Sequence, residues 1–106
     1  MNRKKQVLVV GAAGFIGTYL IDELRKAEFR VLACDVNAVG RAHYRKQGVP
    51  FEIIDVTKKS DMEKLPKKGI DAVVNLACVQ PANVNKEAYD PIAYVKVNVI
   101  GTLNLL

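Results

Sequence analysis

Three glycines at equal spacing, Gly11, Gly14 and Gly17, are the residues of this chain best suited to binding chemistry. An apolar run over residues 6–10 comes directly before them, and an amphipathic stretch follows. Glycines between a strand and a helix let the backbone approach an anion, and the free amides at the helix N-terminus face it. No Lys-Ser or Lys-Thr pair follows, which excludes a nucleoside triphosphate P-loop. The turn therefore predicts a pyrophosphate site, and a tight turn without a ligand is the alternative.

The three glycines have different expected roles. Gly11 permits a backbone turn that a Cβ would obstruct. Gly14 lets the backbone come close to a pyrophosphate, and Gly17 lets the helix pack tightly against the strand. Phe15 and Ile16 begin the predicted helix, whose positive end faces the anion, and we include them among the cofactor-binding residues.

A single carboxylate sharpens this prediction. Asp35 follows a second apolar run, residues 30–34, and lies eighteen positions after Gly17. At the end of a neighbouring strand it would accept hydrogen bonds from both hydroxyls of an adenosine ribose and repel a 2′-phosphate. The next basic residue is Arg41, so NAD is favoured over NADP. The alternative is that Asp35 is a helix cap or turn residue.

The elements that position these residues alternate along the chain. Apolar runs predict strands at residues 6–10, 30–34, 51–54 and 72–77. Helical patterns occupy residues 15–27, more weakly 37–48, a short segment that begins at a Ser60–Glu63 capping box, and 91–106 with Asp90 as the cap. This alternation predicts an α/β fold, a Rossmann-like doubly wound parallel sheet in the order 3-2-1-4, as one incomplete domain over residues 1–106.

Two predicted helices carry apolar stripes. The first has one stripe: Ile16, Leu20, Leu24 and Ala27. The last has two: Ile92, Val95, Val99, Leu103 and Leu106, and then Tyr94, Val97, Gly101 and Leu105. A helix that is apolar on two sides is expected to be buried on two sides.

Composition excludes several classes of protein. The chain has 106 residues, of which half are hydrophobic and a quarter charged, as in a soluble globular domain. No apolar run approaches the ~20 residues that cross a bilayer, so we expect no membrane segment and a cytoplasmic location. The net charge of +5 is spread over predicted loops, which favours a solvated surface over nucleic-acid binding. Cys34, Cys78 and His43 have no zinc-type spacing, so no metal is expected.

On these residues the chain resembles the extended short-chain dehydrogenase/reductase family, the NAD-dependent epimerases and dehydratases of nucleotide sugars. Residues 11–17 are similar to the family's glycine turn, and Asp35 to its ribose-binding acid. Gly40-Arg41 resembles the segment whose arginine packs near the adenosine. Asp55-Val56 resembles the adenine-contacting pair, although a turn carboxylate is an open alternative for Asp55.

Two later segments extend the resemblance. Residues 74–78, Val-Asn-Leu-Ala-Cys, are similar to the family's His-Leu-Ala-Ala segment, which lies against the cofactor, and depart from it at Asn75 and Cys78. The resemblance therefore implies cofactor contacts at Leu76, Ala77 and Cys78. Residues 98–106 match the family's Asn-x-x-Gly-Thr-x-Asn-Leu-Leu run.

The family's catalytic residues have no counterpart in this sequence. The family uses a Ser or Thr and a Tyr-x-x-x-Lys pair. The four tyrosines, Tyr19, Tyr44, Tyr89 and Tyr94, are followed four positions later by Glu23, Gly48, Ala93 and Asn98. We therefore assign no catalytic residue and expect the chain to be inactive on its own, as the NAD-binding N-terminal part of an epimerase/dehydratase-like oxidoreductase.

An incomplete sheet has consequences for partners. In the order 3-2-1-4 the fourth strand is an edge that exposes backbone and apolar side chains. We expect a fragment or truncated product that associates with itself or with another chain through this strand and the last helix. The alternative function is a non-catalytic NAD(P)-binding or protein-interaction module.

Overall fold

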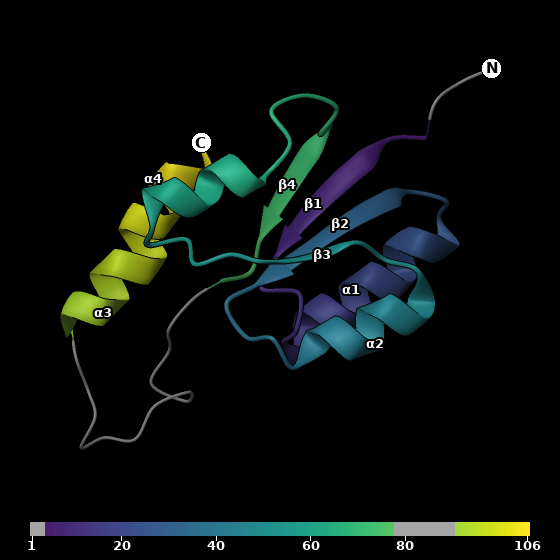
Figure 1. Ribbon diagram of the computed structural model, residues 1–106, viewed down its shortest axis with the longest axis horizontal. Helices are drawn as coiled ribbons and strands as arrows, with labels where there is room; N and C mark the ends of the chain where they lie inside the picture. The colour runs from purple at the N-terminus through teal and green to yellow at the C-terminus, as the bar shows by residue number, and fades with distance from the viewer. Residues whose placement is uncertain (1–3, 78–90) are drawn as a thin grey trace.

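The sheet has the predicted strand order. A computed structural model describes residues 4–77 and 91–106. Its four parallel strands are β1 (Gln6–Val10), β2 (Arg30–Asp35), β3 (Phe51–Ile53) and β4 (Ala72–Asn75), in the order β3-β2-β1-β4 (Figure 1). The α/β class and the Rossmann-like arrangement are thereby confirmed.

The helices form two groups. One contains α1 (Phe15–Lys26) and α2 (Gly40–Gln47). The other contains the 3₁₀ helix η1 (Lys59–Lys64) and a C-terminal helix with three consecutive segments: α3 (Pro91–Val95), the π-helical η4 (Lys96–Ile100) and α4 (Gly101–Leu105). Figure 1 shows the two groups on different sides of the molecule. No helix in the described residues is long and apolar enough to cross a membrane.

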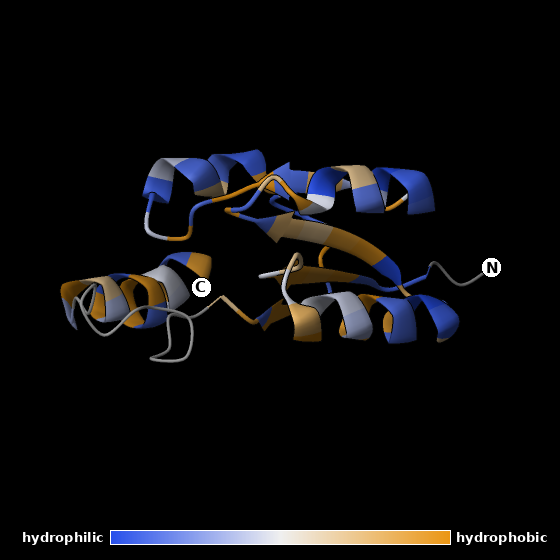
Figure 2. Ribbon diagram, turned by 90° about the horizontal axis from the view of Figure 1, so that it is seen from below, coloured by the Kyte–Doolittle hydropathy of each residue, from blue (hydrophilic) through white to orange (hydrophobic). Residues whose placement is uncertain are grey.

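Both faces of the two central strands are buried, as the continuous apolar runs predicted. Alternate side chains point to opposite faces of a strand. Val9 and Ala33 pack with the α1 and α2 residues, whereas Leu8 and Leu32 pack on the side of η1 and the C-terminal helix. Figure 2 shows the hydrophobic strands between helices that carry both hydrophilic and hydrophobic residues. The first cluster therefore fixes α1 and α2, and the second fixes the other group.

The apolar stripe of α1 differs from the predicted one. Ile16 is 66% exposed and Ala27 is exposed, while Gly17 and Ile21 are buried. The core-facing residues are Gly17, Leu20, Ile21 and Leu24. The helix turns this face inward because Gly17 lies against the backbone of the glycine turn.

The C-terminal helix is packed on one side only, so its predicted burial on two sides is wrong for the described chain. The stripe that includes Val97 and Leu105 packs against the second core cluster. The other stripe is exposed, with Ile92 at 63% and Leu103 at 61%. The cap assigned to Asp90 lies outside the described residues. Val73 on β4 is 46% exposed, as expected for an edge strand.

The capping box at residues 60–63 is also wrong. The 3₁₀ helix η1 begins one residue earlier, at Lys59, and no side chain caps it. Asp61, inside the predicted box, instead accepts a hydrogen bond from the backbone of Asp55. The local pattern therefore marked a helical turn correctly but misassigned its polar contacts.

Candidate functional site

A pocket of about 840 Å³ lies at the carboxyl ends of the strands, within the usual size range for small-molecule sites. In open α/β sheets ligands bind at this edge. Its walls come from the ends of β1, β2 and β4, the segment after β3, the start of α1 and the C-terminal helix. The residues that line it are Val10, Gly11, Gly14, Phe15, Ile16, Gly17, Asp35, Val36, Ile54, Asp55, Val56, Thr57, Asn75, Leu76, Ala77, Ala93, Lys96 and Val97. Of the predicted site residues that the structure describes, the pocket therefore brings together all except Arg41.

Two glycines of the turn are required by the fold itself. Gly11 has a φ of +85°, and a Cβ there would lie 2.8 Å from the carbonyl carbon of Leu76. A Cβ on Gly17 would lie 2.5 Å from the carbonyl oxygen of Gly11. Both obstacles are backbone atoms, which cannot move aside as a flexible side chain can. Any protein with this turn would need these two glycines, with or without a ligand.

Gly14 is different, because the fold leaves room for a side chain there. Its φ of −77° and ψ of 172° suit any residue. A Cβ would meet the carbonyl oxygen of Gly11 at 3.5 Å, an ordinary contact. Gly14 also lines the pocket. The fold therefore does not require a glycine at position 14. Because Gly14 has no side chain, this part of the pocket wall is bare backbone.

The amides of the turn are divided between the protein and the pocket. Gly11 and Ala12 donate to the Cys34 carbonyl oxygen at 2.9 and 3.0 Å, and Ala13 donates to Asp35 Oδ2 at 2.9 Å. Phe15 and Ile16 open α1, and the first amides of a helix have no intrahelical acceptor. Both residues line the pocket, so the positive end of α1 is available to an anion there.

Asp35 joins the turn to the pocket. Its Oδ2 accepts the Ala13 amide, and its Oδ1 accepts the Asn37 amide at 2.9 Å. Asp35 is therefore a turn residue, as the alternative interpretation predicted. Each carboxylate oxygen can accept a further hydrogen bond, and Asp35 lines the pocket. The structural contacts and a ligand contact are thus compatible.

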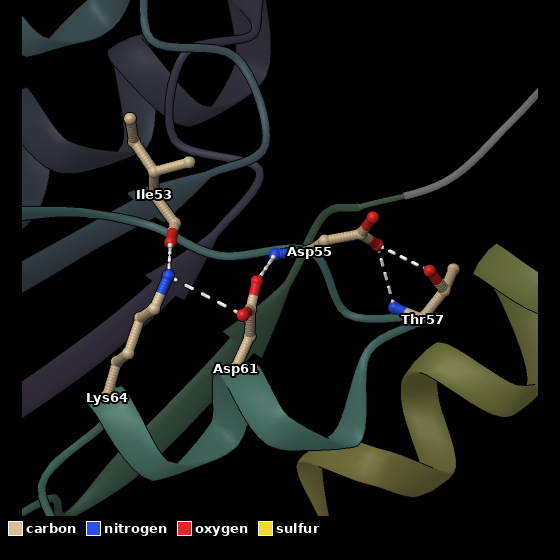
Figure 3. A network of polar contacts seen from close by, with 5 residues as sticks. All are labelled: Ile53, Asp55, Thr57, Asp61 and Lys64. Atoms are coloured by element: carbon tan, nitrogen blue, oxygen red, sulfur yellow. Dashed lines mark hydrogen bonds and ion pairs between the residues drawn. The ribbon is translucent and has the colours of Figure 1, made fainter.

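Asp55 is held in a polar network at the end of β3 (Figure 3). Its Oδ1 accepts the Thr57 amide at 2.9 Å and the Thr57 hydroxyl at 2.6 Å. Its own amide donates to Asp61 Oδ2 at 2.9 Å, and Lys64 reaches Asp61 Oδ1 at 3.5 Å. Asp55 is therefore both a turn carboxylate and a pocket residue.

The pKa values of Asp61 and Cys34, which lie near the site, are shifted. The Asp55 amide that donates to Asp61 is the main reason why the pKa of that carboxyl lies below its usual value, and nearby Lys64 adds to the effect. Burial raises the pKa of the Cys34 thiol to about 12, and the charges of Asp35 and Glu52 add to the rise. Cys34 is therefore a neutral core thiol, and it supports the site through its backbone carbonyl.

The end of β4 is tied to the C-terminal helix. Asn75 Nδ2 donates to the Thr102 hydroxyl at 3.1 Å, and Asn75 Oδ1 accepts the Ala77 amide at 3.1 Å. Asn75 departs from the resembled histidine, yet it lines the pocket together with Leu76 and Ala77. Cys78, predicted beside them, lies outside the described residues.

Arg41 occupies a different place from the other predicted residues. It lines a separate hollow of about 360 Å³ between α2 and β3, together with Arg45 and residues 48–51. Its part in adenosine binding stays a prediction that rests on the resemblance.

The sequence interpretation missed several pocket residues. Thr57 and Asn75 directly adjoin predicted positions, so strand-end adjacency was a signal for them. Lys96, the one lysine or arginine among the described residues that line the pocket, carried no such signal. It reaches the pocket only because the C-terminal helix packs beside η1 and the end of β3, which is a tertiary contact.

Known proteins match this chain over nearly its full length. The model of the NAD dependent epimerase/dehydratase family matches residues 7–106. UDP-glucuronic acid decarboxylase 6 of Arabidopsis thaliana is 39% identical over 107 residues, covering 95% of this chain and 29% of that protein.

Solved structures show the same fold. The UDP-glucose 4-epimerase of Thermus thermophilus, in complex with NAD, aligns with a TM-score of 0.79 and 33% identity over 94% of this chain and 32% of its own. L-threonine dehydrogenase from Clostridium difficile aligns with a TM-score of 0.75 and 28% identity over 97% of this chain and 32% of its own. The chain thus spans less than a third of the length of each of these relatives.

Proposed function

Because the chain belongs to the NAD dependent epimerase/dehydratase family, as the resemblance implied, we propose that it binds NAD in the pocket at the strand ends. It would serve as the cofactor-binding part of an oxidoreductase that acts on nucleotide sugars. The observation that carries this proposal is Gly14, a pocket glycine that the fold itself does not require. A pyrophosphate that contacts the backbone there explains the missing side chain.

The pocket residues divide among the parts of NAD. The amides of Phe15 and Ile16, at the positive end of α1, would bind the pyrophosphate. Asp35 would accept hydrogen bonds from the adenosine ribose, which favours NAD over NADP.

The remaining contacts follow from the family resemblance. Asp55 and Val56 would contact adenine, with Arg41 near the adenosine. The segment from Leu76 to Cys78 would lie against the cofactor. NAD, when bound, would accept a hydride from the carbon of a sugar hydroxyl.

The proposal includes no complete reaction for these 106 residues. The sequence has no Tyr-x-x-x-Lys pair to act as acid and base. General acid–base catalysis typically contributes about 10²–10⁴-fold to rate. We therefore expect no turnover of UDP-glucose or UDP-glucuronate by this chain with NAD, and measurable turnover would contradict this part of the proposal.

Calorimetric titration of the chain with NAD and NADP tests cofactor binding. Gly14→Ala should lower the affinity for NAD by about tenfold or more while the chain stays folded, since a Cβ fits there except against a ligand. NAD should bind more tightly than NADP, and Asp35→Ala should reduce that difference.

Gly48→Ala is the matched control. Gly48 has a φ of +72° and does not line the pocket at the strand ends, so alanine there strains the backbone away from the pyrophosphate and ribose contacts. This variant should lose stability and keep its affinity for NAD. Equal affinity in Gly14→Ala and the unmodified chain would remove the site assignment.

The alternative, a protein-interaction module, draws on the exposed apolar surface. Val73 on β4 and the exposed stripe of the C-terminal helix, with Val99 at 52% and Leu103 at 61% exposure, present apolar side chains to solvent. We propose that this surface associates with a second copy or another chain. Sedimentation at several concentrations should detect self-association that Leu103→Glu weakens, and a monomer at all concentrations would exclude the second copy.

Three further predictions from the sequence remain proposals. Binding of nucleic acid is not expected, because the basic pairs lie in loops and at element ends, and a filter-binding assay at physiological salt checks this. No membrane association and a cytoplasmic location are likewise proposed, and fractionation of cells that express the chain tests both.

A further inference from the structure

One peptide group of the glycine turn is held at both of its polar ends by side chains from other elements. The Tyr44 hydroxyl, on α2, donates to the Ala12 carbonyl oxygen. The other end of the same peptide, the Ala13 amide, donates to Asp35 Oδ2 at 2.9 Å. Tyr44 and Ala12 are buried, at 1% and 0% exposure. This peptide cannot rotate without breaking a hydrogen bond in a nearly dry environment, where such breaks are costly.

The packing of α2 places the Tyr44 hydroxyl. The Tyr44 ring stacks on Phe51 with centroids 5.8 Å apart, and His43 contacts it edge-on at 5.0 Å. At Gly40 a Cβ would lie 3.1 Å from Ala13 Cβ, so glycine lets α2 approach the turn. Burial raises the pKa of Tyr44, so its hydroxyl keeps the proton that it donates.

The Ala12–Ala13 peptide lies immediately before the residues that face the pocket. Gly14 follows Ala13, and Phe15 then opens α1. The direction of the Phe15 and Ile16 amides depends on the path of the turn, and the Ala12–Ala13 peptide fixes that path. Asp35, which accepts the amide of this peptide, also lines the pocket.

We propose that Tyr44 is a positioning residue for the pyrophosphate of the dinucleotide. It acts through the Ala12–Ala13 peptide and touches no part of the ligand. The inference rests on the proposed function, since it assumes a dinucleotide in this pocket.

Tyr44→Phe tests the inference, because it keeps the ring and its packing and removes only the hydroxyl. The full chain is titrated with ADP-ribose by calorimetry and with adenosine by NMR. We expect the affinity for ADP-ribose to fall about tenfold, with a much smaller change for adenosine. If Tyr44 had a purely structural role, its substitution would lower the affinities for both ligands by the same factor.

Two control variants separate positioning from stability. Phe51→Leu disturbs the ring beneath Tyr44 and keeps the hydroxyl, so it should lower the melting temperature and leave the ratio of the two affinities unchanged. Tyr19→Phe removes a hydroxyl from a side chain that is 67% exposed and should change neither quantity.

The outcomes are distinguishable. Should the unmodified chain bind neither NAD nor ADP-ribose, the proposed function fails and this inference fails with it. A second case is that the unmodified chain binds NAD and ADP-ribose. If Tyr44→Phe then binds ADP-ribose as tightly as the unmodified chain does, or loses affinity for ADP-ribose and adenosine by the same factor, only this inference is overturned. A selective loss for ADP-ribose in Tyr44→Phe and its absence in Phe51→Leu support it.

Discussion

The pocket has two walls that are held in different ways. The glycine turn, residues 11–17, is fixed mainly by backbone contacts: the Gly11 and Ala12 amides bond to the Cys34 carbonyl oxygen, and Gly11 and Gly17 lie against main-chain atoms. The side chains of Tyr44 and Asp35 hold one further peptide of the turn. The C-terminal helix, residues 91–105, is fixed by side chains and leaves one apolar stripe exposed. Backbone contacts tolerate almost no change, whereas side-chain contacts can adjust. The pocket therefore has one rigid wall, the glycine turn, and one adjustable wall, the C-terminal helix.

The contacts of the C-terminal helix explain a motif seen in the sequence. Gly101 lies so close to Val56 that a Cβ would be 2.5 Å from Val56 Cγ2. Asn104 Nδ2 donates to the Val56 carbonyl oxygen at 2.8 Å, and the Thr102 hydroxyl accepts from Asn75. The Gly-Thr-x-Asn part of the motif thus docks the helix onto Val56 and Asn75, which line the pocket.

The largest effect is expected at the rigid wall. Gly17→Ala places a Cβ 2.5 Å from the Gly11 carbonyl oxygen and 2.9 Å from Ala12 Cα. Backbone has to shift, so we expect a loss of about 3 kcal/mol in the free energy of unfolding, measured by urea denaturation. Gly14→Ala is the matched control in the same turn and should change this free energy by less than about 0.5 kcal/mol. Similar losses in the two variants would mean that the turn is not held by its backbone.

A smaller effect is expected at the adjustable wall. Gly101→Ala places its Cβ 2.5 Å from Val56 Cγ2, a side-chain atom and not backbone. We expect a loss of about 1–2 kcal/mol in the free energy of unfolding. Because the clash involves one side chain, adding Val56→Ala should remove part of that loss, and a double-mutant cycle measures the coupling. Strictly additive losses in the cycle would place the cost of Gly101→Ala somewhere other than Val56.

The two walls also differed in how well they could be predicted. The strands and the glycine turn follow from local patterns: continuous apolar runs, glycine spacing and a strand-end carboxylate. These patterns gave the sheet order, the glycine-turn residues of the pocket and Asp35, because parallel strands bring their carboxyl ends to one edge. Asp55, Val56, Leu76 and Ala77 came from the family resemblance. Lys96 and the one-sided packing of the C-terminal helix depend on how a distant helix meets the sheet. An apolar stripe such as Ile92 to Leu106 is the same in sequence whether a neighbour covers it or not.

The α1 stripe shows a further reason for error. Ile16 continues the apolar spacing of the helix, yet it faces the pocket because Gly17 must lie against the turn. Backbone proximity outweighed the burial of one isoleucine, and only the turn geometry reveals this. The same geometry explains why Tyr44, a residue without any motif, contacts the turn.

The smallest effect is expected at Asp61 in η1, the 3₁₀ helix that contacts the C-terminal helix. Asp61 receives the Asp55 amide, and its pKa is lowered mainly by that hydrogen bond. A carboxyl whose folded-state pKa is lowered stabilises the protein fully above the unfolded value of 3.8, and this contribution is lost as the pH falls through the folded value. Asp61→Asn keeps an acceptor and removes the charge. Its urea midpoint should lie slightly below that of the unmodified chain at neutral pH.

The difference between the two urea midpoints should close as the pH falls through the lowered folded-state pKa of Asp61, because the carboxyl is then protonated in both the folded and unfolded states. Lys64→Met is the matched control, since Lys64 adds only a secondary part of the pKa shift. Its midpoint should change less with pH than that of Asp61→Asn. A difference that stays constant from neutral to acidic pH would show that the Asp61 charge does not hold η1. The C-terminal helix would then be held by its other contacts, among them those of Gly101 and Asn104 with Val56.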